Sequence, residues 1–184
     1  MTTEAIRALC SSQFFKNFAE INSAYVVDND GVEALFTLIE ESAASPSGKA
    51  NRESTGFRAS YILEYIYFKY PLVFTPYEDR FVALFPLITD EGAKRHFGKM
   101  MADWLTSHKL DKVTTEKIAE AAASWIIEPK VRVAVQIWAM EVLLSLRNQV
   151  EWIPDTIHNL METLTVHATP AINVRLKEWN KRLK

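Results

Sequence analysis

The sequence predicts an all-α fold, an α–α superhelix of about four to five antiparallel helix pairs. Apolar residues recur at helical spacing along most of the 184 residues, and no convincing run alternates strictly between apolar and polar residues. Short turns separate the apolar stretches, and short connections make neighbouring helices pack antiparallel. Arginines also recur at an even step: Arg58, Arg95 and Arg132 follow one another at intervals of 37 residues, and Arg175 comes 43 residues later. A period of this size is typical of stacked helical repeats.

The N-terminal part is the least regular. Residues 9–27 mix apolar and polar side chains at helical spacing, and the sequence Asp-Asn-Asp-Gly at residues 28–31 ends that stretch. Because a solenoid needs its end repeats sealed from water, we expect residues 1–30 to form an N-terminal cap. A helix is predicted over residues 32–43. Residues 44–55 are rich in small and polar side chains, which predicts a mobile loop.

Three helices are predicted in the middle of the chain. The first covers residues 53–70 and ends before a proline. The second covers residues 75–88, where Thr-Pro-Tyr-Glu supplies an N-cap, a proline in the first turn and an acid near the positive end of the helix dipole. The third covers residues 91–108 and carries its large apolar side chains on one stripe.

Four further helices complete the prediction. One begins with Thr-Thr-Glu-Lys at residues 114–117. The next, over residues 130–147, is apolar on nearly all sides and is therefore expected to be the most buried. Residues 153–166 and 171–183 follow. Together these helices predict a single helical-repeat domain over residues 1–184.

Composition narrows the class of protein. Hydrophobic residues make up 48% and charged residues 24% of the chain, which is ordinary for a globular protein. The net charge of −2 divides into −5 over residues 1–90 and +3 over residues 91–184, which disfavours nucleic acid as a partner. Cys10 is the only cysteine and excludes an intramolecular disulfide. With no secretion signal and no apolar run long enough to span a bilayer, we expect a cytoplasmic protein that makes no membrane contact.

One turn carries a family resemblance. The sequence Glu-Pro-Lys-Val-Arg at residues 128–132 resembles the turn inside HEAT repeats, an armadillo-like family in which an acid, often a proline, and then Val-Arg open the second helix. Residues 90–95 match it with one extra residue, residues 169–175 keep the proline and Val-Arg, and Phe57-Arg58 keeps an apolar residue and the arginine. The resemblance covers about residues 53–184. It implies a HEAT-like solenoid that acts as a non-enzymatic binding scaffold for a protein or peptide, held on a concave helical face.

The candidate residues follow from that architecture. An arginine at the start of a second helix donates to carboxylates or carbonyls of the preceding turn or the adjacent repeat, so we interpret the recurring arginines as a structural ladder. Its members are Arg58, Arg95, Arg132 and Arg175. We expect the polar side chains of the second helices to line the partner-binding face. The candidates are Arg95, His96, Lys99, Asp103, Gln136 and Glu141.

The aromatic and histidine residues have structural interpretations. The five tryptophans predict core packing between layers, with Trp179 the most exposed of them. His96 is placed on a solvated helix face of alternating charge. The histidine spacing indicates no metal site, and no cofactor is implied. The helix over residues 53–70 is unusually aromatic, and Tyr65 and Tyr67 cannot both face one core, which leaves open that one of them presents its ring to a partner.

Two other functions stay open. Some DNA-alkylation-repair glycosylases are built from HEAT-like repeats, and they are similar to this chain in fold class and tryptophan content. Residues 45–51, Ser-Pro-Ser-Gly-Lys-Ala-Asn, faintly resemble the flexible Ser-rich loop of the fumarase/adenylosuccinate lyase superfamily, but without its Met-Pro. No catalytic motif stands out elsewhere, and the sequence indicates neither the partner nor the oligomeric state.

Overall fold

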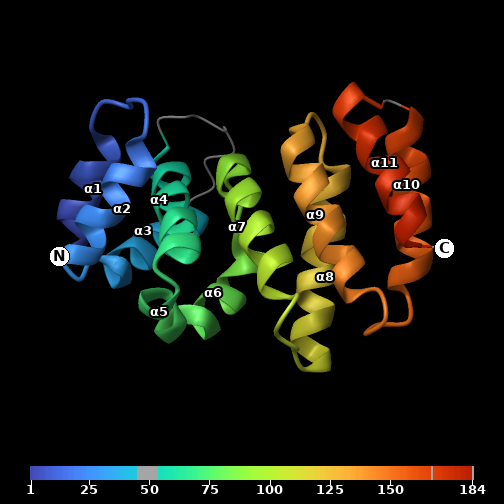
Figure 1. The fold of residues 1–184 in the computed structure, drawn as a ribbon, viewed down its shortest axis with the longest axis horizontal. Coiled ribbons are helices and arrows are strands. Elements are labelled where there is room, and N and C mark those ends of the chain that lie inside the picture. The colour runs from blue at the N-terminus through green and yellow to red at the C-terminus, as the bar shows by residue number, and fades with distance from the viewer. Residues whose placement is uncertain (45–53, 167, 184) are drawn as a thin grey trace. The chain divides into compact units, whose positions relative to one another are not determined.

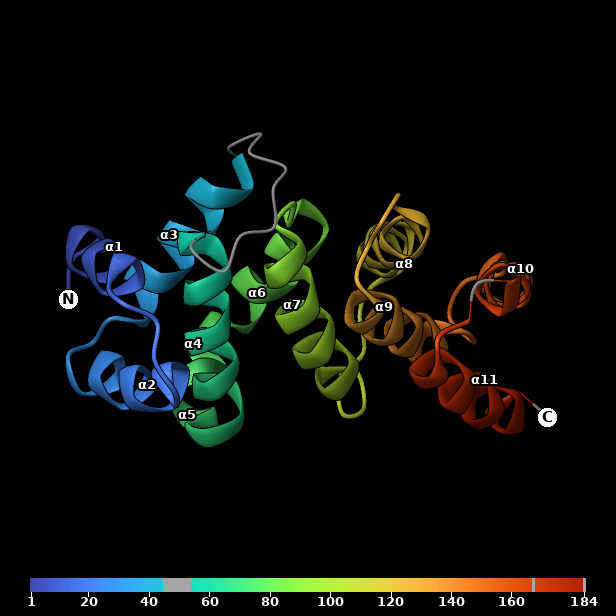
Figure 2. The ribbon, with the colours of Figure 1, turned by 90° about the horizontal axis from the view of Figure 1, so that it is seen from above.

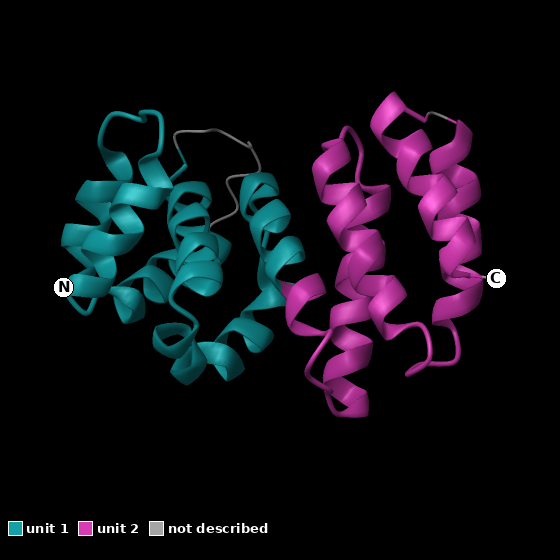
Figure 3. Cartoon of the chain, in the orientation of Figure 1, with its two compact units in different colours: residues 1–100 teal, residues 101–184 magenta. Residues whose placement is uncertain are grey.

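The structure, a computed structural model, describes residues 1–44, 54–166 and 168–183, and every regular element within these ranges is helical (Figure 1). The all-α prediction is therefore confirmed, whereas the superhelix stays a prediction. The chain divides into two compact units, residues 1–100 (unit 1) and residues 101–184 (unit 2) (Figure 3). Nearly all of the predicted mobile loop, and with it the lyase-like stretch at residues 45–51, lies outside the described residues.

Unit 1 begins with four helices: α1 (Thr3–Ser11), α2 (Phe18–Asp28), α3 (Val32–Ala44) and α4 (Thr55–Lys69). α1 lies against α3, and α2 lies against α4 (Figure 2). The predicted stretch over residues 9–27 is split, because Asn17 at φ 67° takes a left-handed conformation that no helix can continue through. The residues predicted as a cap are thus two helices with their own buried faces, built on Ile6, Cys10, Phe18 and Val26.

The next segment of unit 1 is broken where one continuous helix was predicted over residues 75–88. It consists of α5 (Pro71–Phe74), η1 (Thr75–Tyr77), α6 (Glu78–Leu84) and η2 (Phe85–Leu87). Pro76 and Pro86 each lack a backbone N–H donor, so the regular α-helical hydrogen bonding gives way to the 3-10 turns η1 and η2 around them, although Thr75 and Phe85 before them keep helical backbone angles. Short helical pieces suffice here because Phe74, Phe81 and Phe85 anchor them in the core.

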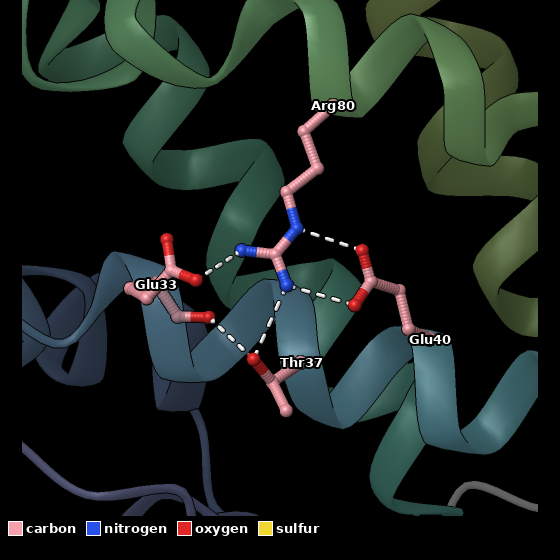
Figure 4. A network of polar contacts seen from close by, with 4 residues as sticks. All are labelled: Glu33, Thr37, Glu40 and Arg80. Atoms are coloured by element: carbon pink, nitrogen blue, oxygen red, sulfur yellow. Dashed lines mark hydrogen bonds and ion pairs between the residues drawn. The ribbon is translucent and has the colours of Figure 1, made fainter.

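A side-chain network joins α6 to α3 (Figure 4). The Arg80 guanidinium donates from Nε and Nη2 to the two carboxylate oxygens of Glu40, at 2.7 and 2.8 Å. It also donates from Nη1 to Glu33 at 2.6 Å and from Nη2 to Thr37 Oγ1 at 3.2 Å, and it lies 5.4 Å from the centre of the Phe36 ring. The hydrogen bond from Arg80 holds the pKa of Glu40 below its ordinary value, so this pair stays charged at neutral pH.

α7 (Glu91–Trp104) begins in unit 1 and ends in unit 2. The Asp90 side chain accepts a hydrogen bond from the Ala93 amide at 2.9 Å and so caps the start of the helix. The helix ends four residues before the predicted end at residue 108. His108 instead folds back in a turn, and its ring stacks on Trp104 with 4.1 Å between the ring centres.

Unit 2 continues with α8 (Lys112–Ile127), α9 (Val133–Leu146), α10 (Ile153–Val166) and α11 (Pro170–Arg182). α8 packs on α9, and α10 and α11 pack on them and on each other. α8 starts earlier than predicted because Asp111, and not Thr114, is its N-cap; Asp111 accepts from the Thr114 amide at 3.0 Å. α9 starts later than predicted because Lys130 has φ 62°, which belongs to a turn. No residue of α9 is exposed, as its apolar composition predicted.

The two units have different aromatic cores. Every phenylalanine and tyrosine of the sequence lies in residues 1–100, and all five tryptophans lie in residues 101–184. Trp179 was predicted to be the exposed tryptophan, and this was wrong: it is 0% exposed, and its indole N–H donates to Glu141 Oε1 at 2.8 Å. Trp138 and Trp152 are the half-buried ones. A basic helix end therefore does not imply a solvated ring, because α11 turns Trp179 inward together with Ile172 and Leu176.

Within the described ranges, no helix combines the length and the apolar character that crossing a bilayer requires.

Candidate functional site

The main surface feature of unit 1 is a row of aromatic side chains along one face of α4. The row, called the aromatic stripe below, consists of Phe57, Tyr61, Tyr65 and Phe68. Its spacings of four, four and three residues keep all four rings on one helix face. Ring centres are 6.1 Å apart for Phe57 and Tyr61 and 5.6 Å apart for Tyr61 and Tyr65. The first three rings are half-buried and Phe68 is 46% exposed, so the stripe is packed on one side and open on the other.

The start of α4 fixes the register of the stripe. Ser54 is the N-cap: its hydroxyl oxygen accepts from the Phe57 amide at 3.1 Å, and its O–H donates to Asp90 Oδ2 at 2.7 Å. The start of α4 is thereby tied to the start of α7. Gly92 of α7 admits the first ring of the stripe, since a Cβ at that position would lie 2.4 Å from Cδ2 of Phe57.

A buried polar cluster lies beside the stripe. Glu64, 8% exposed, reaches α7 through both carboxylate oxygens. Its Oε2 is 2.5 Å from Nδ1 of His96, and its Oε1 accepts from the Lys99 ammonium at 2.5 Å. The His96 ring stacks on Tyr61 with 4.9 Å between the ring centres and lies 5.4 Å from the ring of Phe57. The cluster therefore supports the first two rings of the stripe, Phe57 and Tyr61, on their buried side.

The protonation states in this cluster follow from burial and from the partners. Burial alone would raise the pKa of Glu64, but the hydrogen bonds from His96 and Lys99 and the positive charge of Lys99 outweigh burial and hold that pKa below its ordinary value. Burial lowers the pKa of His96, and the attraction of the Glu64 carboxylate does not offset it. A neutral imidazole that donates from Nδ1 to an ionised carboxylate fits both directions. Nε2 of His96 is then a bare acceptor, and it has no hydrogen-bond partner among the described residues.

Two cations border the open side of the stripe. The Lys99 ammonium lies 4.7 Å from the centre of the Phe68 ring, a cation–π distance. Arg95 is exposed, and for the parts of the chain that the structure describes no hydrogen bond or ion pair is recorded for its guanidinium. Burial, with the neighbouring Tyr65 and Glu64, raises the pKa of Tyr61, and the charge of Arg95 acts in the opposite direction. Arg95 adjoins His96, whose ring stacks on Tyr61, and it precedes Lys99 by one turn on the same face of α7, which places it on the same side of the stripe.

The structure brings three predicted partner-binding residues together at this place, Arg95, His96 and Lys99. The expectation of a solvated His96 was wrong, because that ring is 3% exposed; its partner Glu64 lies 32 residues earlier in the chain. Asp103 is exposed in the last turn of α7, within unit 2.

The other two predicted residues belong to unit 2, where they connect helices. Gln136 donates from its side-chain amide to the carbonyl of Ile126 at 3.2 Å. Glu141 accepts from the indole of Trp179 and, at 2.5 Å, from Arg182. Both side chains are half-buried. Through these hydrogen bonds Gln136 joins α9 to α8, and Glu141 joins α9 to α11.

The evenly spaced arginines make unequal contacts. Arg58, 6% exposed, donates to the carbonyls of Cys10, at 2.8 Å, and Ser12, at the end of α1. Arg175 pairs with Glu178 of its own helix at 2.9 Å. Arg132 is exposed at the N-cap of α9, and Arg95 borders the stripe. A contact from an arginine to carbonyls of a preceding helix, as the ladder implies, is recorded for Arg58.

The described ranges hold no group of three histidine, cysteine or acidic residues that could bind a metal ion. His158 is exposed and within 2.8 Å of the Pro154 carbonyl, and His167 lies outside the described residues. Burial raises the pKa of Cys10 to about 12, so the thiol stays protonated at neutral pH and is unreactive.

Sequence reasoning missed Glu64, although one signal points to it. It is the only acid between residues 54 and 77, and its neighbours on the inward side of the helix include Ile62, Leu63 and Ile66. An isolated acid on an apolar helix face implies a buried partner, since an unpaired buried carboxylate is costly.

Comparison with known proteins found no matching family model, no matching curated protein and no matching solved structure.

Proposed function

We propose that this chain is a non-enzymatic binding module whose aromatic stripe docks a protein or peptide partner. The observation that carries the proposal is a row of four partly exposed rings held in fixed register on one helix. Tyrosine and phenylalanine offer a large contact area and lose few rotatable bonds on binding, so such rings are frequent anchors of protein interfaces. The Ser54 cap, the Gly92 contact and the Glu64–His96 pair hold the rings before a partner arrives, which lowers the entropic cost of binding.

The Glu64–His96 pair supports positioning rather than catalysis. A carboxylate hydrogen-bonded to Nδ1 is the arrangement that orients a histidine general base. Here, however, the ring is 3% exposed and covered by Phe57 and Tyr61, so a substrate could not reach Nε2 without displacing the stripe. The pair instead supports the rings from beneath.

We further propose that the helix pairs stack as HEAT-like repeats. The support is the pair α8 and α9, which pack together across the short turn that carries the best sequence match, residues 128–132. In such a scaffold the second helix of each pair lines the binding face. α7 carries Arg95 and Lys99 in that position, which agrees with a partner at the stripe.

The experiment is a selection from a display library of random short peptides. The immobilised proteins are the wild-type chain, the double variant Tyr65→Ala/Phe68→Ala and the control Ile127→Ala. Ile127 is 64% exposed on α8 of unit 2, so the control also removes exposed apolar area, but away from the stripe. We expect the wild type and the control to enrich the same peptides and the double variant to lose them. Identical enrichment on all three proteins would refute the proposal, provided circular dichroism shows each variant folded.

Single-stranded nucleic acid is the second candidate, since rings beside cations can stack bases and hold phosphates. The charge balance favours a peptide: residues 1–100 contain 10 basic and 13 acidic side chains, a net charge of −3. A strand that follows a protein surface needs several phosphate contacts, and among the described residues of α7 two cations, Arg95 and Lys99, border the stripe.

A further inference from the structure

Resting on the proposed function, we infer that the partner of the aromatic stripe is an acidic peptide segment, which places a carboxylate against Arg95 and Lys99 and an apolar or aromatic side chain against Tyr65 and Phe68. The inference comes from the charges around the stripe, which differ in sign from the net charge of unit 1.

The acidic side chain that α4 itself carries beside the stripe is already engaged, and Asp90 near the first ring accepts from Ser54 and from the Ala93 amide. Glu64 is buried, Oε2 is hydrogen-bonded to His96 and Oε1 to Lys99. Both carboxylate oxygens are therefore turned to the protein, and the negative charge is shielded from an arriving ligand. Among the described residues of unit 1 on this face of α7, the groups that face solvent beside the rings are the exposed guanidinium of Arg95 and the partly exposed ammonium of Lys99, whose side chain is 37% exposed; the exposed Asp103 follows one turn later, within unit 2. The edge of the stripe is thus locally positive although unit 1 as a whole is negative.

The donors match a carboxylate. A guanidinium presents a planar fork of N–H groups that fits the two oxygens of a carboxylate. An ammonium has three donors, and the contact to Glu64 uses one of them. Arg95 and Lys99 are one turn apart on the same face of α7, about 6 Å between Cβ atoms. A single acidic side chain can lie between them, or two on one turn of a bound helix can pair with them.

The rings and the cations together disfavour a positively charged ligand. Tyrosine rings can bind an ammonium by cation–π attraction, but a cationic ligand at this stripe would meet Lys99 at Phe68 and Arg95 one turn before it on α7. Like charges at contact distance cost binding energy, so a basic or methylated-lysine peptide is disfavoured. A peptide with an apolar side chain flanked by acidic residues matches both the rings of the stripe and the cations beside them.

The test uses the peptides that the library selection enriches. One enriched peptide is synthesised together with its amide isostere, in which every Glu is replaced by Gln and every Asp by Asn. Binding of both to the wild-type chain is measured by fluorescence anisotropy at two salt concentrations. We expect enrichment of acids next to aromatic or aliphatic residues, an affinity about tenfold weaker for the isostere, and weaker binding of the acidic peptide at high salt.

Charge variants locate the contact. Arg95→Glu should weaken the acidic peptide at least as much as the isostere substitution does, and Arg95→Gln should weaken it less. Lys177→Glu is the matched control, because it makes the same change in net charge at an exposed position of α11 in unit 2. It should leave the affinity within about twofold of the wild type, as expected for screened long-range charge.

The outcomes separate the two proposals. Suppose that the selected peptides need Tyr65 and Phe68 but bind with equal affinity as amide isosteres, or bind Arg95→Glu as tightly as the wild type. Either result would overturn the inference that the partner is acidic and would leave the proposed docking function standing. Peptides indifferent to Tyr65→Ala/Phe68→Ala, or no enrichment at all, would overturn both. A labelled oligo-dT strand that binds more tightly than any selected peptide, and does so through Tyr65 and Phe68, would replace the acidic peptide by nucleic acid.

Discussion

At the scale of single residues, two polar side chains of unit 1, His96 and Arg80, are expected to contribute most clearly to its stability. His96 is enclosed between rings and a carboxylate, and Glu64 is its only hydrogen-bonding contact recorded in the described chain. Arg80 is partly exposed but reaches four acceptor atoms on α3. Each of these residues supports a prediction about stability.

His96 should make unit 1 sensitive to mild acid. Its pKa is lower in the folded state than the ordinary value of about 6.5, so below that pH the unfolded chain binds the proton more readily and stability falls. The slope can reach about 1.4 kcal/mol per pH unit, the maximum for one proton. Glu64 has a lowered pKa, so its own loss of stability begins only at more acidic pH, near the ordinary carboxyl value and below.

Urea denaturation between about pH 8 and about pH 5.5 measures this slope. His96→Asn keeps a donor near the position of Nδ1 and does not titrate, so its stability should change less over that range. His158→Asn, at an exposed histidine of unit 2, is the control and should behave as the wild type does. A slope that His96→Asn leaves unchanged would contradict the assignment of a neutral His96.

Arg80→Lys should destabilise unit 1 by about 1 kcal/mol, because a compact ammonium cannot reach Glu33, Thr37 and both oxygens of Glu40 at once. Thermal denaturation of the variant beside Arg7→Lys measures the difference. Arg7 makes a single exposed pair with Glu41, for which a change near zero is expected. Equal effects of both substitutions would mean that the network in Figure 4 adds nothing beyond an ordinary surface pair.

At the scale of elements, the least obvious contact is the one that holds the end of α1. The last carbonyls of a helix have no partners within it. Here Arg58 of α4 supplies one, and its guanidinium also lies 5.5 and 5.7 Å from the ring centres of Phe14 and Phe18. A residue that the sequence period singled out thus attaches the N-terminal helix to the rest of unit 1.

Arg58→Met should destabilise α1 selectively. Methionine keeps much of the side-chain volume but leaves the carbonyls of Cys10 and Ser12 without this donor, at a cost of about 2 kcal/mol. Amide hydrogen exchange should then become faster in α1 than in α8 or α9. Arg175→Met, at the ladder position of α11, removes only a pair within one helix and should leave exchange in α1 unchanged. Uniformly faster exchange throughout the chain would rule out a local role for Arg58.

Most of the helices could be predicted from the sequence, because a helix that buries one face has apolar residues at helical spacing. α10 has the predicted bounds, and α3 extends the predicted range by one residue. The errors fell where a single residue outweighs the period: proline at Pro76 and Pro86, and positive φ at Asn17 and Lys130. The site was harder to predict. The aromatic content of α4 was visible, but the pairing of Glu64 with His96 depends on how α4 and α7 align, which no local pattern specifies.

At the scale of the whole molecule, the proposed HEAT-like stacking makes a prediction about dimensions. A compact domain of 184 residues has a radius of gyration of about 16 Å. Stacked helix pairs give a more extended particle, so small-angle scattering of the monomer should give a larger value. A value at the compact limit would contradict the solenoid and leave the stripe proposal untouched, since the stripe lies wholly within unit 1.

The separation of aromatic residue types makes the two units optically distinct. Light absorbed by indole alone reports on residues 101–184. The phenol absorption reports on the tyrosines, all within residues 1–100, and two of these, Tyr61 and Tyr65, belong to the stripe. A ligand bound at that site should perturb the phenol spectrum directly. Any accompanying change in indole emission would then measure how far binding is transmitted along the chain, with no label attached to the protein.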